Sequence, residues 1–213
     1  MNRFVSFLVM KINLPGKEYC RNIHKGFCLP SRVSDHCEKV AGVGYIIGNM
    51  LIERIVAINP DMIHRLGLVH DAFKTATLSL RDLKNHPEGI SFNELVGWLP
   101  LRMLHKGDHE TEVAARELKR DFSEFARIVR QIGSSKNPSY LDARSEVRVH
   151  HYADWRVQGV EVVPFSERLK YLKDKYFNGS EAEGQERLEK EKQLEAELFK
   201  YLNFEPEDLA LLL

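Results

Sequence analysis

The sequence predicts an all-α fold, a single helical domain with an added C-terminal helix. Along most of the chain, apolar residues recur at intervals of three and four, the period of a helix that buries one face. No stretch alternates apolar and polar residues cleanly enough to indicate a strand. The chain has 213 residues, enough for one domain with a sizeable core. We therefore expect a domain over residues 1–177, and a hinge and helix over 178–213 that pack on it.

Composition and charge narrow the function classes. Lys+Arg and Asp+Glu both number 31, so the formal net charge is zero, whereas nucleic-acid binders usually carry a basic excess. The apolar N-terminal stretch MNRFVSFLVMKI is cut by Lys11 and is shorter than the about 20 residues that a membrane span needs. We interpret it as a buried N-terminal segment of a cytoplasmic protein, with neither membrane nor nucleic acid as a partner.

Three cysteines, Cys20, Cys28 and Cys37, make an odd count that does not suit a disulfide framework. They interleave with His24 and His36, which raises the question of a zinc site. However, the spacing contains no paired Cys-x2-Cys pattern of the kind that structural zinc sites use. Reduced thiols near the core are the favoured interpretation.

The first long helix is expected to start near residue 31. Ser31 or Ser34 is a candidate capping residue, because a serine hydroxyl can accept a hydrogen bond from a free backbone N–H of the first turn. The apolar positions that follow recur at helical spacing and are Val33, Val40, Val43, Ile47, Met50 and Leu51.

The next two helix starts also carry capping signals. Asn59 precedes Pro60 and ends the preceding segment, since a residue before proline resists helical dihedral angles. Asp61 is then expected to cap a helix through Met62, Leu66, Val69 and Phe73. After a turn over residues 85–89, Ser91 and Glu94 have the spacing of a capping box.

The second half of the chain is also predicted to be helical. Helices are expected from Asp108, Ser123, Tyr140 and Ser166, with Gly133 as a C-terminal cap before a loop over residues 134–138. The valine-rich connector over 158–164 is expected to be extended. A polar hinge over 178–184 should precede a terminal helix with Leu188, Leu194, Leu198 and Leu202 on one face and solvated charges opposite. Its closing Leu-Ala-Leu-Leu-Leu is expected to dock on the core.

The candidate metal ligands lie in three separate helical segments. His70 and Asp71 are adjacent at the end of an apolar helix, a pairing that is weak evidence by itself. His36 lies upstream and Asp154 far downstream, each on a predicted helix. Polar groups in apolar surroundings are costly to bury without a partner, and a divalent cation is such a partner. Two imidazoles with two carboxylates suit one ion of Mn, Fe, Co, Ni or Zn, with Mg as a further candidate.

Three motifs that occur in order resemble those of the HD-domain metal-dependent phosphohydrolases. The motifs are His36 with Val40-Ala41, Leu68-Val69-His70-Asp71 with Lys74, and Tyr152-Ala153-Asp154 with Arg156-Val157. The following run over residues 163–168, Val-Pro-Phe-Ser-Glu-Arg, is also similar to that family's usual continuation. The resemblance covers about residues 30–175 and implies a helical domain around one metal ion. In the first motif, the Val-Ala pair falls one residue later than is typical of the family.

The resemblance also implies a reaction. A metal ion polarises a phosphoryl oxygen and lowers the pKa of water to about 7, which makes a nucleophile at neutral pH. Asp71 is the candidate catalytic residue that steers the proton, and Lys74 is the candidate catalytic and substrate-binding cation. Lys74 lies four residues after His70, on the same face of a continuous helix. In the 5′-nucleotidase branch a glutamate stands at that position, so the chain departs from that branch.

Two further histidines are weaker candidates. His109 resembles the first of the additional histidines that two-metal family members use, whereas no histidine occurs near residues 131–133 for the second. One metal ion is therefore expected, and His109 is interpreted either as a substrate-phosphate contact or, equally, as a histidine at a helix start. His150 lies four residues before Asp154, but a packing role is favoured for it. Arg156 is expected to pair with a neighbouring carboxylate.

The leading hypothesis is hydrolysis of a phosphomonoester of a nucleotide or related small metabolite. The alternative is a non-catalytic HD module that binds a nucleotide or a protein partner in regulation. That alternative predicts a broken ligand set, and all four ligands are present. RNA processing is a third hypothesis, against which the neutral charge argues. The sequence leaves open whether the chain forms oligomers.

Overall fold

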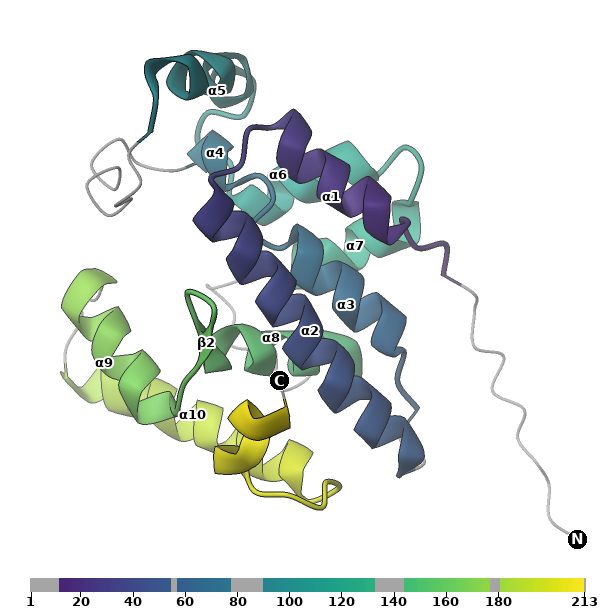
Figure 1. Ribbon diagram of the computed structural model, residues 1–213, viewed down its shortest axis with the longest axis vertical. Coiled ribbons are helices and arrows are strands. Elements are labelled where there is room, and N and C mark those ends of the chain that lie inside the picture. The colour runs from purple at the N-terminus through teal and green to yellow at the C-terminus, as the bar shows by residue number, and fades with distance from the viewer. Residues whose placement is uncertain (1–11, 55–56, 78–89, 133–143, 177–180, 213) are drawn as a thin grey trace, which may run out of the picture.

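A computed structural model describes residues 12–54, 57–77, 90–132, 144–176 and 181–212, and over these the chain is mostly helical (Figure 1). This confirms the predicted all-α class. The helices are α1 (Lys17–Gly26), α2 (Ser31–Glu53), α3 (Pro60–Val69), α4 (Lys74–Thr77), α5 (Phe92–Leu104), α6 (Glu110–Leu118), α7 (Ser123–Ile132), α8 (Ser145–Arg156), α9 (Phe165–Tyr176) and α10 (Glu181–Phe199). A 3-10 helix, Pro206–Leu212, follows. No helix among the described residues is both long and apolar enough to cross a membrane.

The connector after α8 forms a small hairpin rather than a single extended segment. Strands β1 (Val157–Gln158) and β2 (Glu161–Val162) pair antiparallel, with Val157 opposite Val162. Gly159 lies in the turn with φ +65°, in the left-handed region that favours glycine. The hairpin follows directly from the helix that carries Asp154, which places its turn close to that residue.

The helix starts were predicted with mixed success. The capping box of α5 is confirmed, with Ser91 Oγ accepting from the Glu94 N–H and the Glu94 carboxylate accepting from the Ser91 N–H. For α3, the prediction that Asp61 is the N-cap residue was wrong. The side chain of Asn59 caps the helix by accepting from the Met62 N–H at 3.1 Å. Pro60 then occupies the first helical position, where its missing N–H has no consequence.

The start of α2 also differs from prediction. The helix does begin at Ser31, but its N-cap is Pro30 and no side chain caps it, so neither Ser31 nor Ser34 has that role. Ser34 instead hydrogen-bonds through Oγ to His24 Nδ1 at 2.9 Å. The predicted start of α7 at Ser123 is confirmed. The N-terminal segment, the turn over 85–89, Gly133 and the loop over 134–138 lie outside the described residues.

Helix α3 ends at Val69, four residues earlier than predicted. In a continuous helix the Gly67 carbonyl would accept from the N–H of residue 71. Here His70 Nδ1 donates to that carbonyl at 2.7 Å, and residues 70–73 form turns before α4 begins. A side chain that bonds the backbone locally competes with the helix in this way. The prediction that His70 and Lys74 share one continuous helix was therefore wrong.

The close approach of α2 and α3 positions one side of the site. A Cβ on Gly67 would lie 2.5 Å from Ala41 Cα, a distance that real side chains do not tolerate. Gly44 similarly faces Ile63, with an added Cβ 2.6 Å from Cγ2. Glycine at these two positions lets the helix backbones approach closely, so that His36 on α2 can face the end of α3.

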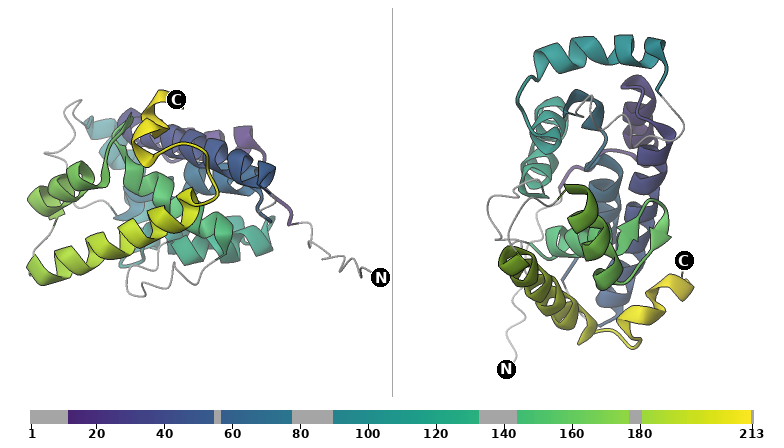
Figure 2. Two further views of the ribbon diagram at one scale, coloured as in Figure 1. Left: turned by 90° about the horizontal axis from the view of Figure 1, so that it is seen from below. Right: turned by 90° about the vertical axis from the view of Figure 1, so that its left-hand side faces the viewer.

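The C-terminal part of the chain packs on the rest. Helix α10 contacts α8 and α9 (Figure 2). Its buried Leu194 and Leu198, together with Leu209, join the apolar cluster around Tyr152 and Phe165. The predicted hinge over 178–184 extends too far toward the C-terminus, because residues 181–184 already belong to α10. The closing leucines dock only in part, since Leu211 is 83% exposed.

The cysteine interpretation is confirmed in part, for the location of two thiols in the core. Cys20, Cys28 and Cys37 are all free thiols. Cys20 and Cys37 are fully buried, as expected near a core, but Cys28 is exposed. Burial raises the pKa of the Cys20 thiol to about 11, which keeps it protonated and unreactive.

Candidate metal centre

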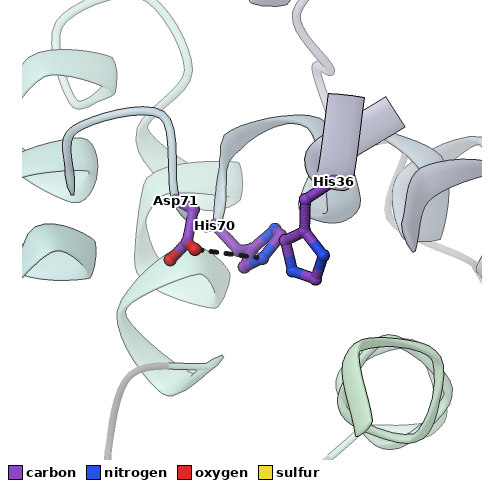
Figure 3. A group of neighbouring side chains, drawn as sticks. All are labelled: His36, His70 and Asp71. Atoms are coloured by element: carbon purple, nitrogen blue, oxygen red, sulfur yellow. Dashed lines mark ion pairs between the residues drawn. The ribbon is translucent and has the colours of Figure 1, made fainter. Parts of the chain in front are cut away.

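The structure brings the four predicted ligand residues together. One ligand atom from each of His36, His70 and Asp71 lies within 4.8 Å of the others (Figure 3). Asp154 Oδ1 lies 3.1 Å from His36 Nε2 and 3.7 Å from His70 Nε2. Asp71 Oδ2 lies 3.8 Å from the same His70 nitrogen. Three segments, α2, the end of α3 and α8, therefore meet at one cluster of donor atoms.

Backbone carbonyls orient both imidazoles. His36 Nδ1 lies 3.0 Å from the carbonyl oxygen of Gly159 in the hairpin turn, and His70 Nδ1 lies 2.7 Å from that of Gly67. A carbonyl only accepts, so each Nδ1 carries the proton. The Nε2 atoms of both rings face the cluster. That of His36 donates to Asp154 Oδ1 at 3.1 Å, and a bound cation would displace this proton and take the lone pair. This arrangement is typical of metal-binding histidines, whose second nitrogen is held by a carbonyl or a carboxylate.

His70 Nε2 lacks a hydrogen-bond partner among the described residues, although it is buried. The nearest carboxylate oxygens, on Asp154 and Asp71, are 3.7 and 3.8 Å away, beyond hydrogen-bond distance. A buried polar atom without a partner costs about 1–3 kcal/mol. His70 Nε2 thus lies near two carboxylates and is hydrogen-bonded to neither of them.

Both carboxylates are held in the ionised form. Burial by itself would raise the pKa of Asp71, but the charge of Lys74, followed by those of His70 and His36, outweighs burial and lowers it to about 2. For Asp154, burial is outweighed by the hydrogen bond to His36 and by the charge of His70, so its pKa lies well below the usual range. The cluster therefore concentrates negative charge where a cation could bind.

Lys74 lies beside this cluster. Its Nζ is 2.7 Å from Asp71 Oδ2, and its side chain is 37% exposed. Burial would lower the pKa of Lys74, but Asp71 outweighs it by charge and hydrogen bonding and raises the pKa, so the lysine is a cation at neutral pH. The turn after α3, rather than a continuous helix, brings it there. Contact between Lys74 and a substrate stays a prediction.

His109 is the N-cap residue of α6. This agrees with one of its two interpretations, that of a histidine at a helix start. Its Nδ1 accepts from the Thr111 N–H at 3.4 Å and lies 2.9 Å from the Thr111 hydroxyl. Nε2 lies 3.6 Å from a carboxylate oxygen of Glu110, and the side chain is 46% exposed. Contact between His109 and a substrate phosphate stays a prediction.

His150 lies closer to the cluster than its predicted packing role required. It is buried, and its ring centroid is 5.2 Å from that of His70, edge to face. Burial, followed by the charge of His70, lowers the pKa of His150 to about 3, so the ring is neutral. The one sequence signal was its spacing of four residues from Asp154. Gly159, which orients His36, carried no such signal.

Comparisons with known proteins give no match. No family model, curated protein or solved structure matches this chain. The motifs and the geometry of the cluster are therefore the evidence for a function.

Proposed function

We propose that this protein is a metal-dependent phosphohydrolase of the HD type, and that His36, His70, Asp71 and Asp154 hold one divalent ion. The observation that carries the proposal is the convergence of these four side chains from three segments, of which the first and last, at His36 and Asp154, are 118 residues apart. The order of the three motifs supports the same assignment. The location we propose is the cytoplasm.

The spacing of the donor atoms fits a single ion. Ligand atoms about 2.1 Å from one metal lie about 3.0 Å apart at octahedral angles and about 3.4 Å apart at tetrahedral angles. The measured separations of 3.1, 3.7 and 3.8 Å are close to this range. Two imidazole nitrogens with two carboxylates suit Mn, Fe, Co, Ni or Zn, and Mg remains a candidate. Such an ion would also give His70 Nε2 the partner that it lacks.

The ion, when bound, supplies Lewis acidity and lowers the pKa of water to about 7. Asp71 is placed to orient an attacking water and to accept its proton, because its carboxylate belongs to the cluster and is ionised. Lys74, held beside Asp71 as a cation, is placed to stabilise negative charge that develops on a phosphoryl group. We propose a phosphomonoester of a nucleotide or of a related small metabolite as the substrate.

A phosphatase screen tests the proposal. Nucleotides and sugar phosphates are incubated with protein from which metal has been removed, with Mn, Co, Ni, Zn or Mg added back. We expect at least one compound to release phosphate only when metal is present. Asp71→Ala and Asp154→Ala should lower this release by more than about 100-fold, because each removes a ligand. Asp121→Ala is the matched control, since this carboxylate pairs with Arg120 on the surface.

Release that persists in Asp154→Ala, or that does not depend on metal, would contradict the proposal. Tight nucleotide binding without turnover by any metal-loaded form would instead support the non-catalytic HD module. Equilibrium binding of the same compounds, measured by calorimetry, separates this outcome from simple inactivity.

A further inference from the structure

Three buried histidines among the described residues have an Nε2 without a hydrogen-bond partner, namely His70, His105 and His150. His105 is the C-cap residue of α5, and its ring nitrogens lie 3.6 and 3.7 Å from the carboxylates of Glu117 and Asp108, neither of which is a proposed ligand. His70 and His150 instead pack ring against ring, with centroids 5.2 Å apart. Two rings, each with an unpartnered Nε2, therefore lie in contact at the candidate metal centre.

The position of His150 on α8 places it on the same side as a proposed ligand. His150 and Asp154 are four residues apart, so their side chains share one face of the helix. Across from that face, His70 is in edge-to-face contact with both His150 and His36, with centroids 5.2 and 5.3 Å away. His150 thus belongs to the same cluster by its position on α8 and by its contact with His70.

The surroundings of His150 suit metal binding. The ring is 4% exposed, and its Nε2 has no hydrogen-bond partner among the described residues. Packing alone explains an apolar side chain at such a site more readily than an imidazole, because the imidazole leaves a buried nitrogen without a partner. His24, another buried histidine, differs in this respect, because its ring contacts both the Ser34 hydroxyl and the Leu68 carbonyl.

We infer that His150 is a fifth protein ligand of the metal centre and binds the ion through Nε2. This inference rests on the proposed function, because it requires that His36, His70, Asp71 and Asp154 hold the ion. A centre with three imidazoles and two carboxylates leaves at most one position of an octahedral ion for a water or a substrate oxygen. It also favours Zn, Co, Ni, Fe and Mn over Mg, which prefers oxygen ligands.

The test counts the imidazoles bound to the metal by NMR, without any use of activity. The probe is ¹¹³Cd²⁺ added to protein labelled with ¹⁵N in its histidines, because a ligating nitrogen shows a ¹⁵N–¹¹³Cd coupling and a distant nitrogen does not. We expect three coupled histidines in the wild type, assigned to His36, His70 and His150. In His150→Phe, which keeps an aromatic ring against His70, we expect two.

His64→Phe is the matched control, because His64 is also a buried histidine with an aromatic neighbour, Tyr45. It lies within α3, six residues before His70, and is not one of the proposed ligands. It should retain three couplings. In a parallel titration, Co²⁺ affinity should fall by more than about tenfold in His150→Phe, since even residues outside the ligand shell commonly change affinity by that much. His64→Phe should bind Co²⁺ as the wild type does.

The outcomes separate the inference from the proposed function. Two couplings in the wild type, from His36 and His70, overturn the inference and leave the proposed metal centre intact. No coupling in the wild type overturns both. Because the wild-type count decides by itself, the test remains valid if His150→Phe fails to fold, which circular dichroism would show.

Discussion

Helix α8 has two polar faces that differ in how their side chains are satisfied. On one face, His150 and Asp154 lie at the candidate metal centre, where two buried imidazole nitrogens lack partners among the described residues. On the other face, His151, Tyr152 and Arg156 contact the C-terminal part of the chain through closely spaced pairs. His150 and His151 are adjacent in sequence, yet the first has an unpartnered nitrogen and the second does not.

The paired face joins α8 to α10. His151 Nε2 lies 2.9 Å from a carboxylate oxygen of Glu191, which is fully buried. The Tyr152 hydroxyl donates to Glu195 at 2.7 Å, and Arg156 donates to the same carboxylate at 2.9 Å. Arg156 therefore pairs with a carboxylate, as the sequence predicted. It also donates to the carbonyls of Val163 and Pro206.

This difference suggests different roles for the two faces. Buried polar groups are normally hydrogen-bonded within the protein, so the paired face is what a structural junction requires. At the face that we call unpaired, two buried imidazole nitrogens have no hydrogen-bond partner among the described residues, and a bound metal ion would supply one. We interpret the first as the attachment of the C-terminal helix and the second as the binding site.

The largest effect should come from breaking the paired face. Glu191→Ala removes a fully buried carboxylate that lies 2.9 Å from His151 Nε2. We expect the free energy of unfolding to fall by about 3 kcal/mol, the lower end for a broken buried pair. Urea denaturation measures it. Glu189→Ala, at an exposed position on the same helix, should change stability by less than about 0.5 kcal/mol, and equal losses would contradict the comparison.

The unpaired face should respond to metal. At a concentration about 100 times the dissociation constant, an ion that binds only the folded state adds about 2.7 kcal/mol to the free energy of unfolding. We expect Mn²⁺ or Co²⁺ to produce a stabilisation of this order in the wild type, seen as a rise in thermal midpoint. Asp154→Ala should abolish the shift, whereas Glu191→Ala should retain it. A shift that survives in Asp154→Ala would place the ion elsewhere.

A buried histidine outside both faces provides a pH reference. Burial, followed by the charges of Lys17 and Arg65, lowers the pKa of His64 from 6.5 to about 4. As the pH falls below 6.5, His64 binds a proton in the unfolded chain, whereas in the folded chain it stays neutral until the pH approaches 4. This contribution to stability is complete above pH 6.5 and is lost as the pH falls toward 4, at up to about 1.4 kcal/mol per pH unit.

His64→Gln should therefore flatten the dependence of stability on pH between 6.5 and 4 by about one proton. Urea denaturation at several pH values measures the slope. The same slope in both proteins would show that His64 is not the group that resists protonation.

The smallest effect is expected for His150→Phe in the absence of metal. Replacing an unpartnered buried imidazole by an apolar ring removes a polar group that the fold does not satisfy, which is commonly close to neutral. We expect a change within about 0.5 kcal/mol by urea denaturation after chelation. A loss as large as that for Glu191→Ala would show that His150 already has a partner in the protein, and the contrast between the two faces would fail.

Local signals in the sequence were sufficient for much of the fold. The capping box at Ser91 and the start of α7 at Ser123 were predicted from residues within one turn. The end of α3 was not, because it depends on the His70 side chain bonding a carbonyl three residues earlier. The hairpin after α8 was foreseen only as an extended connector, since two-residue strands leave almost no periodicity.

For the candidate site, the motifs identified the residues but not the contacts that orient them. His36, His70, Asp71 and Asp154 stood out because they resemble a known pattern. The hydrogen bond from His36 to Gly159 joins residues 123 positions apart, so no local sequence pattern could predict it. The lack of a hydrogen-bond partner for His150 Nε2 among the described residues likewise depends on which side chains pack around it.

The sequence by itself determined the helical class, most helix positions and the chemical identity of the candidate ligands, because period, caps and residue types act over a few neighbours. Only the tertiary structure decided which nitrogens face the cluster, which carboxylates are held ionised and which face of α8 is satisfied. Those properties depend on burial and on atoms that approach from other helices, and burial is a property of the packed chain rather than of any segment.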